Sequence, residues 1–199
     1  MTERVITPDR EQPQLRHGLK GNLAPLQEGH IANKTKTLIL IHCDDNKEEH
    51  ELFRIHLNRT LRQNKQRYSL TIGNDNQNEN AQQDNNSNAL ILYQYFKGEG
   101  AVEAFKSLSN TYYEQIKAGT VEIVVITDYD MPGGIEGHEV RRQVADFASK
   151  KDIKNQRIYL FTGTPRQDSY NQGFTEVFDK YAINKLLTTI ITSSFKGEN

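Results

Sequence analysis

Short apolar runs alternate along this chain with longer amphipathic segments. Three of the runs are Leu38–Ile41, Ile123–Ile126 and Ile158–Phe161, and all three contain β-branched residues. Short continuous runs of this kind are typical of strands that are buried on both faces, as in parallel sheets. They predict the strands of a sheet with both of its faces covered.

The segments between the runs have the apolar spacing of helices. In residues 183–194, for example, apolar residues recur at intervals of three and one, which places them on one helical face. The pattern predicts helices at residues 47–64, 101–117, 136–149 and 183–194, and a short one starting at Thr164-Pro165. Alternation of strands and helices predicts an α/β fold, a doubly wound five-stranded parallel sheet with helices on both faces.

An Asn/Gln-rich segment interrupts the pattern at the second strand. Ten of the 16 residues in 73–88 are Asn or Gln, and one is apolar. Such a segment cannot repay the entropy of ordering by burial, so we expect a disordered loop insertion. It lies between strand-like residues 68–72 and 90–96, and the simplest arrangement is a hairpin with a long disordered tip.

The N-terminal part has no sustained period. Residues 1–35 contain three of the five prolines and many charges, which indicates a flexible tail that is either solvated or binds a partner. We therefore expect one folded domain at residues 36–199.

Composition excludes several classes of protein. The 25 basic and 26 acidic residues give a net charge of −1, so no global charge favours nucleic acid or membranes. The single cysteine, Cys43, excludes an internal disulfide framework and is expected in the core. No apolar run approaches the ~18 residues of a membrane span, and no secretory signal is present. We expect a soluble, cytoplasmic protein.

Polar residues that can bind a ligand or take part in a reaction follow the predicted strands. Asp44 and Asp45 follow the first strand, Asp128 the third, Thr162 the fourth and Lys180 the fifth. Ligands of open α/β sheets bind at the carboxyl ends of strands, so these side chains should converge. Taken singly, Asp44 and Thr162 could be ordinary helix caps and Lys180 a surface residue.

Together, these residues favour phosphoryl chemistry. Clustered carboxylates repel one another, and Mg²⁺ relieves that repulsion while accepting a phosphoryl oxygen as a ligand. A carboxylate beside Mg²⁺ can act as a nucleophile and form an acyl phosphate. An ammonium and a hydroxyl group can stabilise the remaining phosphoryl oxygens.

These motifs resemble the receiver domain of two-component response regulators. LILIHCDD and VVITDYDMPGGIEG are similar to its first and third strands with their acidic residues, and YLFTG and VFDK to its fourth and fifth strands. FKGEGAVEAF resembles the turn into its second helix. The resemblance runs from about Thr37 to Phe195 and implies a flavodoxin-like sheet of strand order 2-1-3-4-5.

The resemblance also implies roles for individual residues. Asp128 would be the phosphoacceptor, and it would bind Mg²⁺ together with Asp45 and the backbone carbonyl of Asp130. Asp44 would act mostly through a metal-bound water. Thr162 and Lys180 would contact the phosphoryl group.

The family's partners are implied in the same way. A sensor histidine kinase or a histidine phosphotransfer protein would donate the phosphoryl group, and a downstream protein or a second copy of the chain would receive the signal. Only residues 196–199 follow the last predicted helix. We therefore expect a stand-alone receiver with no output domain, no direct nucleic-acid or membrane contact, and no turnover of a substrate.

The chain departs from the family pattern next to the lysine. Tyr181 follows Lys180 where receivers usually have proline. Val177 occupies the position of the usual switch aromatic, and Phe178 is expected on the opposite face of the strand.

Three other interpretations stay open. A receiver-like module that is not phosphorylated would have the same residues, and the chain could be part of a hybrid kinase. Asp128-Tyr129-Asp130 also resembles the nucleophile motif of haloacid-dehalogenase-like phosphatases, although no acidic pair follows Lys180. A metal site formed by His50 and His56 is disfavoured, because residues six apart lie on different helical faces.

Overall fold

A computed structural model describes residues 35–63, 68–74, 77–78, 88–165 and 172–195. The predicted tail at residues 1–35 lies almost wholly outside these residues, as does most of the predicted loop at 73–88. The helix predicted to start at Thr164-Pro165 would also continue into residues that the structure does not describe.

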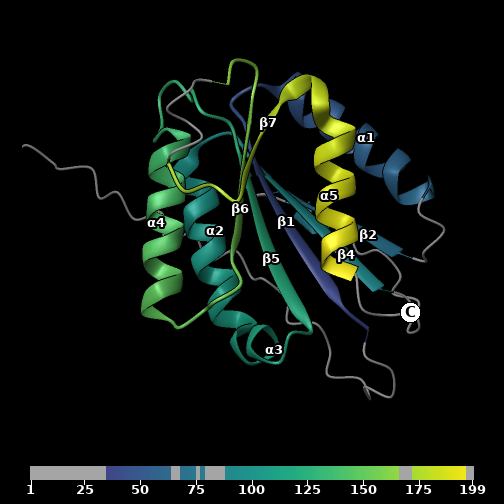
Figure 1. Ribbon diagram of the computed structural model, residues 1–199, viewed down its shortest axis with the longest axis vertical. Helices are drawn as coiled ribbons and strands as arrows, with labels where there is room; N and C mark the ends of the chain where they lie inside the picture. The colour runs from purple at the N-terminus through teal and green to yellow at the C-terminus, as the bar shows by residue number, and fades with distance from the viewer. Residues whose placement is uncertain (1–34, 64–67, 75–76, 79–87, 166–171, 196–199) are drawn as a thin grey trace, which may run out of the picture.

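The described residues form one sheet with helices on both faces (Figure 1). Its strand order is β3-β2-β4-β1-β5-β6-β7, and every pair is parallel except β2 with β3. The strands are β1 Thr37–Cys43, β2 Tyr68–Asn74, β3 Gln77–Asn78, β4 Asn88–Tyr95, β5 Val121–Thr127, β6 Arg157–Thr162 and β7 Glu176–Asp179. The predicted α/β class is therefore confirmed.

Two helices pack together on each face of the sheet (Figure 1). The helices are α1 Lys47–Gln63, α2 Gly98–Thr111, α3 Tyr113–Lys117, α4 Gly137–Lys150, the 3₁₀ turn η2 Lys180–Ala182, and α5 Ile183–Phe195. On one face α2 packs against α4, and on the other α1 packs against α5. Among the described helices, none is long and apolar enough to cross a membrane.

The sheet separates two apolar core clusters. Ile39 and Ile41 of β1 belong to the cluster under α2 and α4, and Leu38 and Leu40 belong to the cluster under α1 and α5. Successive side chains of a strand point to opposite faces. Burial on both faces therefore explains why the strand sequences are continuous apolar runs.

The arrangement around the Asn/Gln-rich segment differs from the prediction. The order β4-β1-β5-β6-β7 is the predicted 2-1-3-4-5, but β2 adds a sixth parallel strand beyond β4. The predicted hairpin is wrong, because β2 and β4 run parallel, with Tyr68 opposite Asn88 and Gly73 opposite Tyr93. A parallel connection needs about a dozen residues or more, and the segment between Asn74 and Asn88 supplies that length.

Candidate functional site

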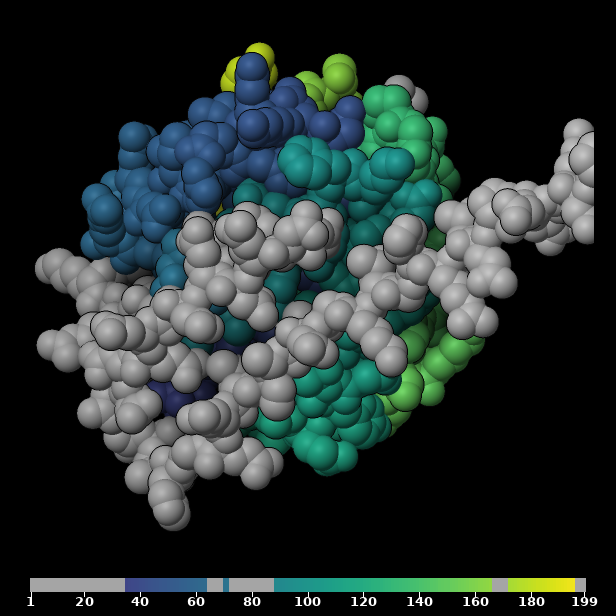
Figure 2. Space-filling model, turned by 180° about the vertical axis from the view of Figure 1, so that it is seen from behind, coloured from purple at the N-terminus to yellow at the C-terminus, as the bar shows by residue number. Residues whose placement is uncertain are grey.

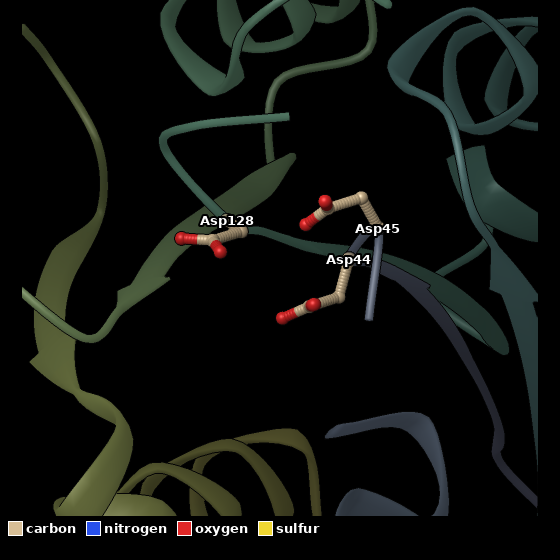
Figure 3. Close-up of side chains that lie close together, drawn as sticks. All are labelled: Asp44, Asp45 and Asp128. Carbon is tan, nitrogen blue, oxygen red and sulfur yellow. The ribbon is translucent and has the colours of Figure 1, made fainter. Parts of the chain in front are cut away.

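Three carboxylates meet at the carboxyl edge of the sheet. Asp44 and Asp45 follow β1, and Asp128 follows the adjacent strand β5. One oxygen of each carboxylate lies within 4.8 Å of the others. Figure 3 shows the side chains of Asp44 and Asp45 leaving the end of β1 in different directions, with both carboxylates on the side where Asp128 lies. The structure thus brings together the three aspartates that the sequence placed at strand ends.

The turn between β1 and α1 gives its two aspartates different surroundings. The backbone N–H of Asp44 donates to the carbonyl of Tyr95 at 3.1 Å, and its Oδ1 accepts the N–H of Asn46 at 2.9 Å. Asn46 Oδ1 accepts the N–H of Glu48 at 2.8 Å, so Asn46, and not Asp44, is the N-cap of α1. Asp44 is fully buried, whereas Asp45 is exposed.

Lys180 bridges two of the three carboxylates. Its Nζ donates to Asp128 Oδ2 at 2.9 Å and forms an ion pair with Asp44 Oδ2 at 2.7 Å. Asp128 Oδ1 accepts the backbone N–H of Tyr129 at 2.6 Å. Both oxygens of the Asp128 carboxylate are therefore oriented, one by the backbone and the other by the lysine.

The turn that carries Lys180 is held without a proline. Asp179 Oδ1 accepts the backbone N–H of Tyr181 at 2.8 Å and caps η2, which begins at Lys180. A proline at this position has no N–H to donate. Tyr181 itself is 95% exposed. The cap therefore replaces the ring constraint expected of the family, and the ammonium group still reaches the aspartates.

Burial and neighbouring charges have opposite effects on the pKa of Asp44 and on that of Lys180. Burial raises the pKa of Asp44 from 3.8 to about 6, although the contacts with Lys180 and with the N–H of Asn46 oppose it. Burial also disfavours the charged form of Lys180, but its contacts with Asp44 and Asp128 outweigh this and raise the Lys180 pKa. The site therefore keeps the half-buried ammonium group of Lys180 charged among acidic oxygens.

The other predicted site residues lie at the same edge of the sheet. Thr162 is buried at the last position of β6, the strand next to β5. Asp130 is exposed, two residues beyond Asp128. Phe178 is buried in the cluster under α1 and α5, while Val177 is half-buried. The aromatic residue thus lies in the core rather than in the usual switch position.

Two buried histidines next to the site were not predicted to act there. His50 Nε2 lies 2.6 Å from the backbone carbonyl oxygen of Asp44, and its ring is 5.0 Å from that of His42. His56 is half-buried and hydrogen-bonds Asn184, so it forms no pair with His50. Helical spacing predicted this separation of faces, but the contact with Asp44 depends on the shape of the turn.

Cys43 lies directly before the acidic pair and is buried, as predicted. Burial raises the pKa of its thiol to about 12, and nearby acidic groups, beginning with Asp44, add to the effect. Its Sγ lies 3.3 Å from the sulfur of Met131. These surroundings fit a core residue rather than a reactive thiolate.

Gly137 at the start of α4 packs directly against the predicted phosphoacceptor. A Cβ atom at this position would overlap the backbone carbonyl oxygen of Asp128. We expect Gly137→Ala to cost about 1–3 kcal/mol of unfolding free energy, because neither backbone segment can move cheaply. Urea denaturation measures this. Gly163→Ala, where a Cβ would meet no atom within 4 Å, is the control, and equal stability of the two variants would contradict the expectation.

Comparison with solved structures identifies the fold. No protein-family model and no curated sequence matches the chain. The receiver domain of the histidine kinase CKI1 from Arabidopsis thaliana, complexed with Mg²⁺, is similar with a TM-score of 0.51 and 16% identity, covering 80% of this chain and 91% of that one. The same domain complexed with Mg²⁺ and BeF₃⁻ gives a TM-score of 0.52 and 16% identity, covering 78% and 87%. The chain has the fold of a receiver domain.

The receiver fold explains where the polar residues meet. The strands that follow β1 in the chain lie on opposite sides of it, β4 on one side and β5 on the other, which creates a topological switch point at the carboxyl ends of β1 and β5. Asp44, Asp45 and Asp128 lie at this point. Ligands of open α/β sheets bind at such a point, and the side chains there determine the chemistry.

Proposed function

We propose that this chain is a phosphoacceptor in a two-component phosphorelay, with Asp128 as the accepting residue. The observation that carries the proposal is the contact of Lys180 with Asp44 and Asp128, beside the third carboxylate of Asp45. A structural lysine would need one partner, whereas this site has three acids and one cation. The excess of negative charge is suited to a divalent cation.

The residues present fit Mg²⁺. Asp45 and Asp128 would hold it with the backbone carbonyl of Asp130, and Asp44 would contact a water ligand. Hard oxygen ligands of this kind, with several positions left to water, suit Mg²⁺ in proteins. When bound, the ion would neutralise charge on the transferring phosphoryl group.

The transfer itself uses the oriented Asp128 carboxylate. One of its oxygens attacks the phosphorus atom, the P–N bond of a donor phosphohistidine breaks, and the imidazole leaves with the electron pair. Conversion to the acyl phosphate ends the 2.9 Å contact between Lys180 and the free carboxylate. Lys180 then pairs with a phosphoryl oxygen, and the hydroxyl of Thr162 donates to another.

The partners of this function are proteins. A sensor histidine kinase or a histidine phosphotransfer protein donates the phosphoryl group, and a downstream protein or a second copy of the chain binds the phosphorylated form. The protein acts as a signalling component whose acyl phosphate forms and hydrolyses, and not as a turnover enzyme. The similarity in fold to the receiver domain of a histidine kinase supports this assignment.

Phosphorylation by a small donor tests the proposal. We expect acetyl phosphate or phosphoramidate with Mg²⁺ to add one phosphoryl group to the wild-type protein, read by intact mass, and Asp128→Asn to abolish the adduct. Asp146→Asn is the matched control and should keep the adduct, because Asp146 is exposed on α4 and pairs with Arg142.

Each alternative gives a different result in the same experiment. No adduct on the folded wild-type protein, or an unchanged adduct on Asp128→Asn, would overturn the proposal and favour a receiver-like module that is not phosphorylated. Steady hydrolysis of a phosphate monoester would favour the phosphatase.

A further inference from the structure

A buried imidazole is hydrogen-bonded to the backbone of the turn that carries Asp44 and Asp45. His50 lies on α1, with only 5% of its surface exposed, and its Nε2 lies 2.6 Å from the Asp44 carbonyl oxygen. A carbonyl oxygen only accepts, so Nε2 must carry the proton and donate. The bond fixes the peptide plane between the two aspartates, and hence the direction in which Asp45 leaves the backbone.

The imidazole is itself held on several sides. Its ring stacks on Phe96 at 4.6 Å and lies 5.0 Å from His42, which stacks on Phe53 at 4.1 Å. We call these four residues the ring column. The backbone carbonyl of His50 accepts a hydrogen bond from Gln94 at 2.8 Å. In Figure 2 blue residues of α1 lie against teal residues, the colour of the part of the chain that contains β4 and α2.

The ring column reaches from the buried core to the metal-binding turn. Phe53 belongs to the cluster under α1 and α5, and His42 is 1% exposed. Burial lowers the pKa of His50, which is consistent with a neutral ring that donates through one nitrogen. Groups next to metal ligands commonly set metal affinity by orienting those ligands, and their loss costs about 10–100-fold in affinity.

We propose that His50 is a positioning residue for the divalent cation, acting through its hydrogen bond to the Asp44 carbonyl. This inference rests on the proposed function only in that Mg²⁺ binds at the cluster of Asp44, Asp45 and Asp128. It adds a residue on α1, outside the metal ligands and the phosphoryl-contacting residues, whose hydrogen bond determines how tightly the site binds the ion.

Two substitutions separate the effect of the hydrogen bond on Mg²⁺ binding from the effect of the ring. His50→Phe keeps a ring that can stack on Phe96 but has no donor, whereas His50→Gln keeps an N–H at similar reach without the ring. The control is His56→Phe, on the same helix, where the half-buried imidazole contacts Asn184 and not the Asp44 carbonyl. Mg²⁺ titrations followed by ¹H–¹⁵N NMR give the dissociation constant of each variant, and circular dichroism checks folding.

We expect His50→Phe to bind Mg²⁺ about tenfold more weakly than wild type, and His50→Gln and His56→Phe to bind it within about twofold. Affinity of His50→Phe equal to wild type, or of His50→Gln as weak as His50→Phe, would overturn the positioning role while leaving the metal site intact. Absence of Mg²⁺ binding to the folded wild-type protein would overturn both.

A measurement on the wild-type protein covers the case in which His50→Phe does not fold. Long-range ¹H–¹⁵N spectra of the ring should show the tautomer protonated at Nε2. Its signals should shift on addition of Mg²⁺ with the same dissociation constant as the Asp45 amide. The other tautomer, or ring signals that do not respond to Mg²⁺, would overturn the inference.

Discussion

Asp44→Asn is expected to make the metal-free protein more stable at pH 7 while weakening its binding of Mg²⁺. The carboxyl group of Asp44 is fully buried, and burial raises its pKa from 3.8 to about 6. Ionisation in the folded state therefore costs more than in the unfolded state, by up to about 3 kcal/mol. An amide of the same shape avoids this cost, so we expect a gain of about 1–3 kcal/mol.

The sign of the pH dependence follows from the raised pKa. Below about pH 4, Asp44 is protonated in both states and contributes nothing. Between about pH 4 and 6, the folded state keeps a proton that the unfolded state has released, so stability falls as the pH rises. Above about pH 6 this loss of stability is complete. The advantage of Asp44→Asn over wild type should therefore grow through this window and then stay constant.

Comparison with wild type is essential, because two histidines act in the opposite direction. Burial lowers the pKa of His42 and His50 below the usual value of 6.5, so stability falls as the pH decreases below that value. Wild type and Asp44→Asn share this contribution, so it cancels in the difference between their free energies of unfolding.

Urea denaturation with EDTA between pH 4 and 8 measures the difference. Asp45→Asn is the control, since Asp45 is exposed and should show a much smaller gain. Mg²⁺ should then stabilise wild type more than Asp44→Asn, because the variant has lost one carboxylate of the site. An Asp44→Asn variant less stable than wild type at pH 7 would show that its carboxylate contributes net stability.

The strands and the acidic cluster could be predicted from the sequence for a physical reason. Strands with both faces buried must be continuous apolar runs, and the residue after such a run lies at the edge of the sheet where parallel strands end. Asp128 could therefore be placed without any tertiary information. The direction of β2 relative to β4 could not, because residues 68–72 alternate between apolar and polar side chains, a pattern that an edge strand of either direction can have.

Other features depend on turn geometry that the pattern does not encode. Asp44 and Asn46 are both good helix caps, and only the structure shows that Asn46 caps α1. The missing proline after Lys180 is offset by the bond from Tyr181 to Asp179, which depends on the backbone angles at that turn. Helical spacing gave the face of His50, but not the carbonyl oxygen that it reaches.

Lys180→Met is expected to destabilise the metal-free protein by about 2–3 kcal/mol at pH 7. Removing one partner of a buried ion pair leaves the other charge uncompensated, which typically costs 3–5 kcal/mol when burial is complete. Lys180 is 17% exposed and its partner Asp128 is 11% exposed, so solvent reduces the cost. Methionine keeps most of the apolar length of the side chain, so the loss reports mainly on charge.

The loss should depend on pH in a way that identifies its cause. Without the ammonium group, the Asp44 pKa rises further, since the contact with Lys180 partly offsets the effect of burial. Near pH 5 Asp44 is protonated in the folded state of wild type as well as of the variant, so the difference in stability between them should shrink. Lys185→Met is the control, because Lys185 is 71% exposed and pairs with Glu176 at 3.7 Å. It should cost below about 1 kcal/mol at either pH.

The same substitution should strengthen Mg²⁺ binding while slowing phosphorylation. Lys180 Nζ forms ion pairs with Asp44 Oδ2 and Asp128 Oδ2. Its positive charge would repel a dication placed beside these oxygens. Its removal should raise the Mg²⁺ affinity at least about tenfold, measured by calorimetry. The acetyl-phosphate reaction should slow, because the ammonium group that would pair with a phosphoryl oxygen is gone. Tighter Mg²⁺ binding with unchanged phosphorylation would assign Lys180 to charge balance alone, whereas weaker Mg²⁺ binding would show that the lysine organises the carboxylates instead of competing for them.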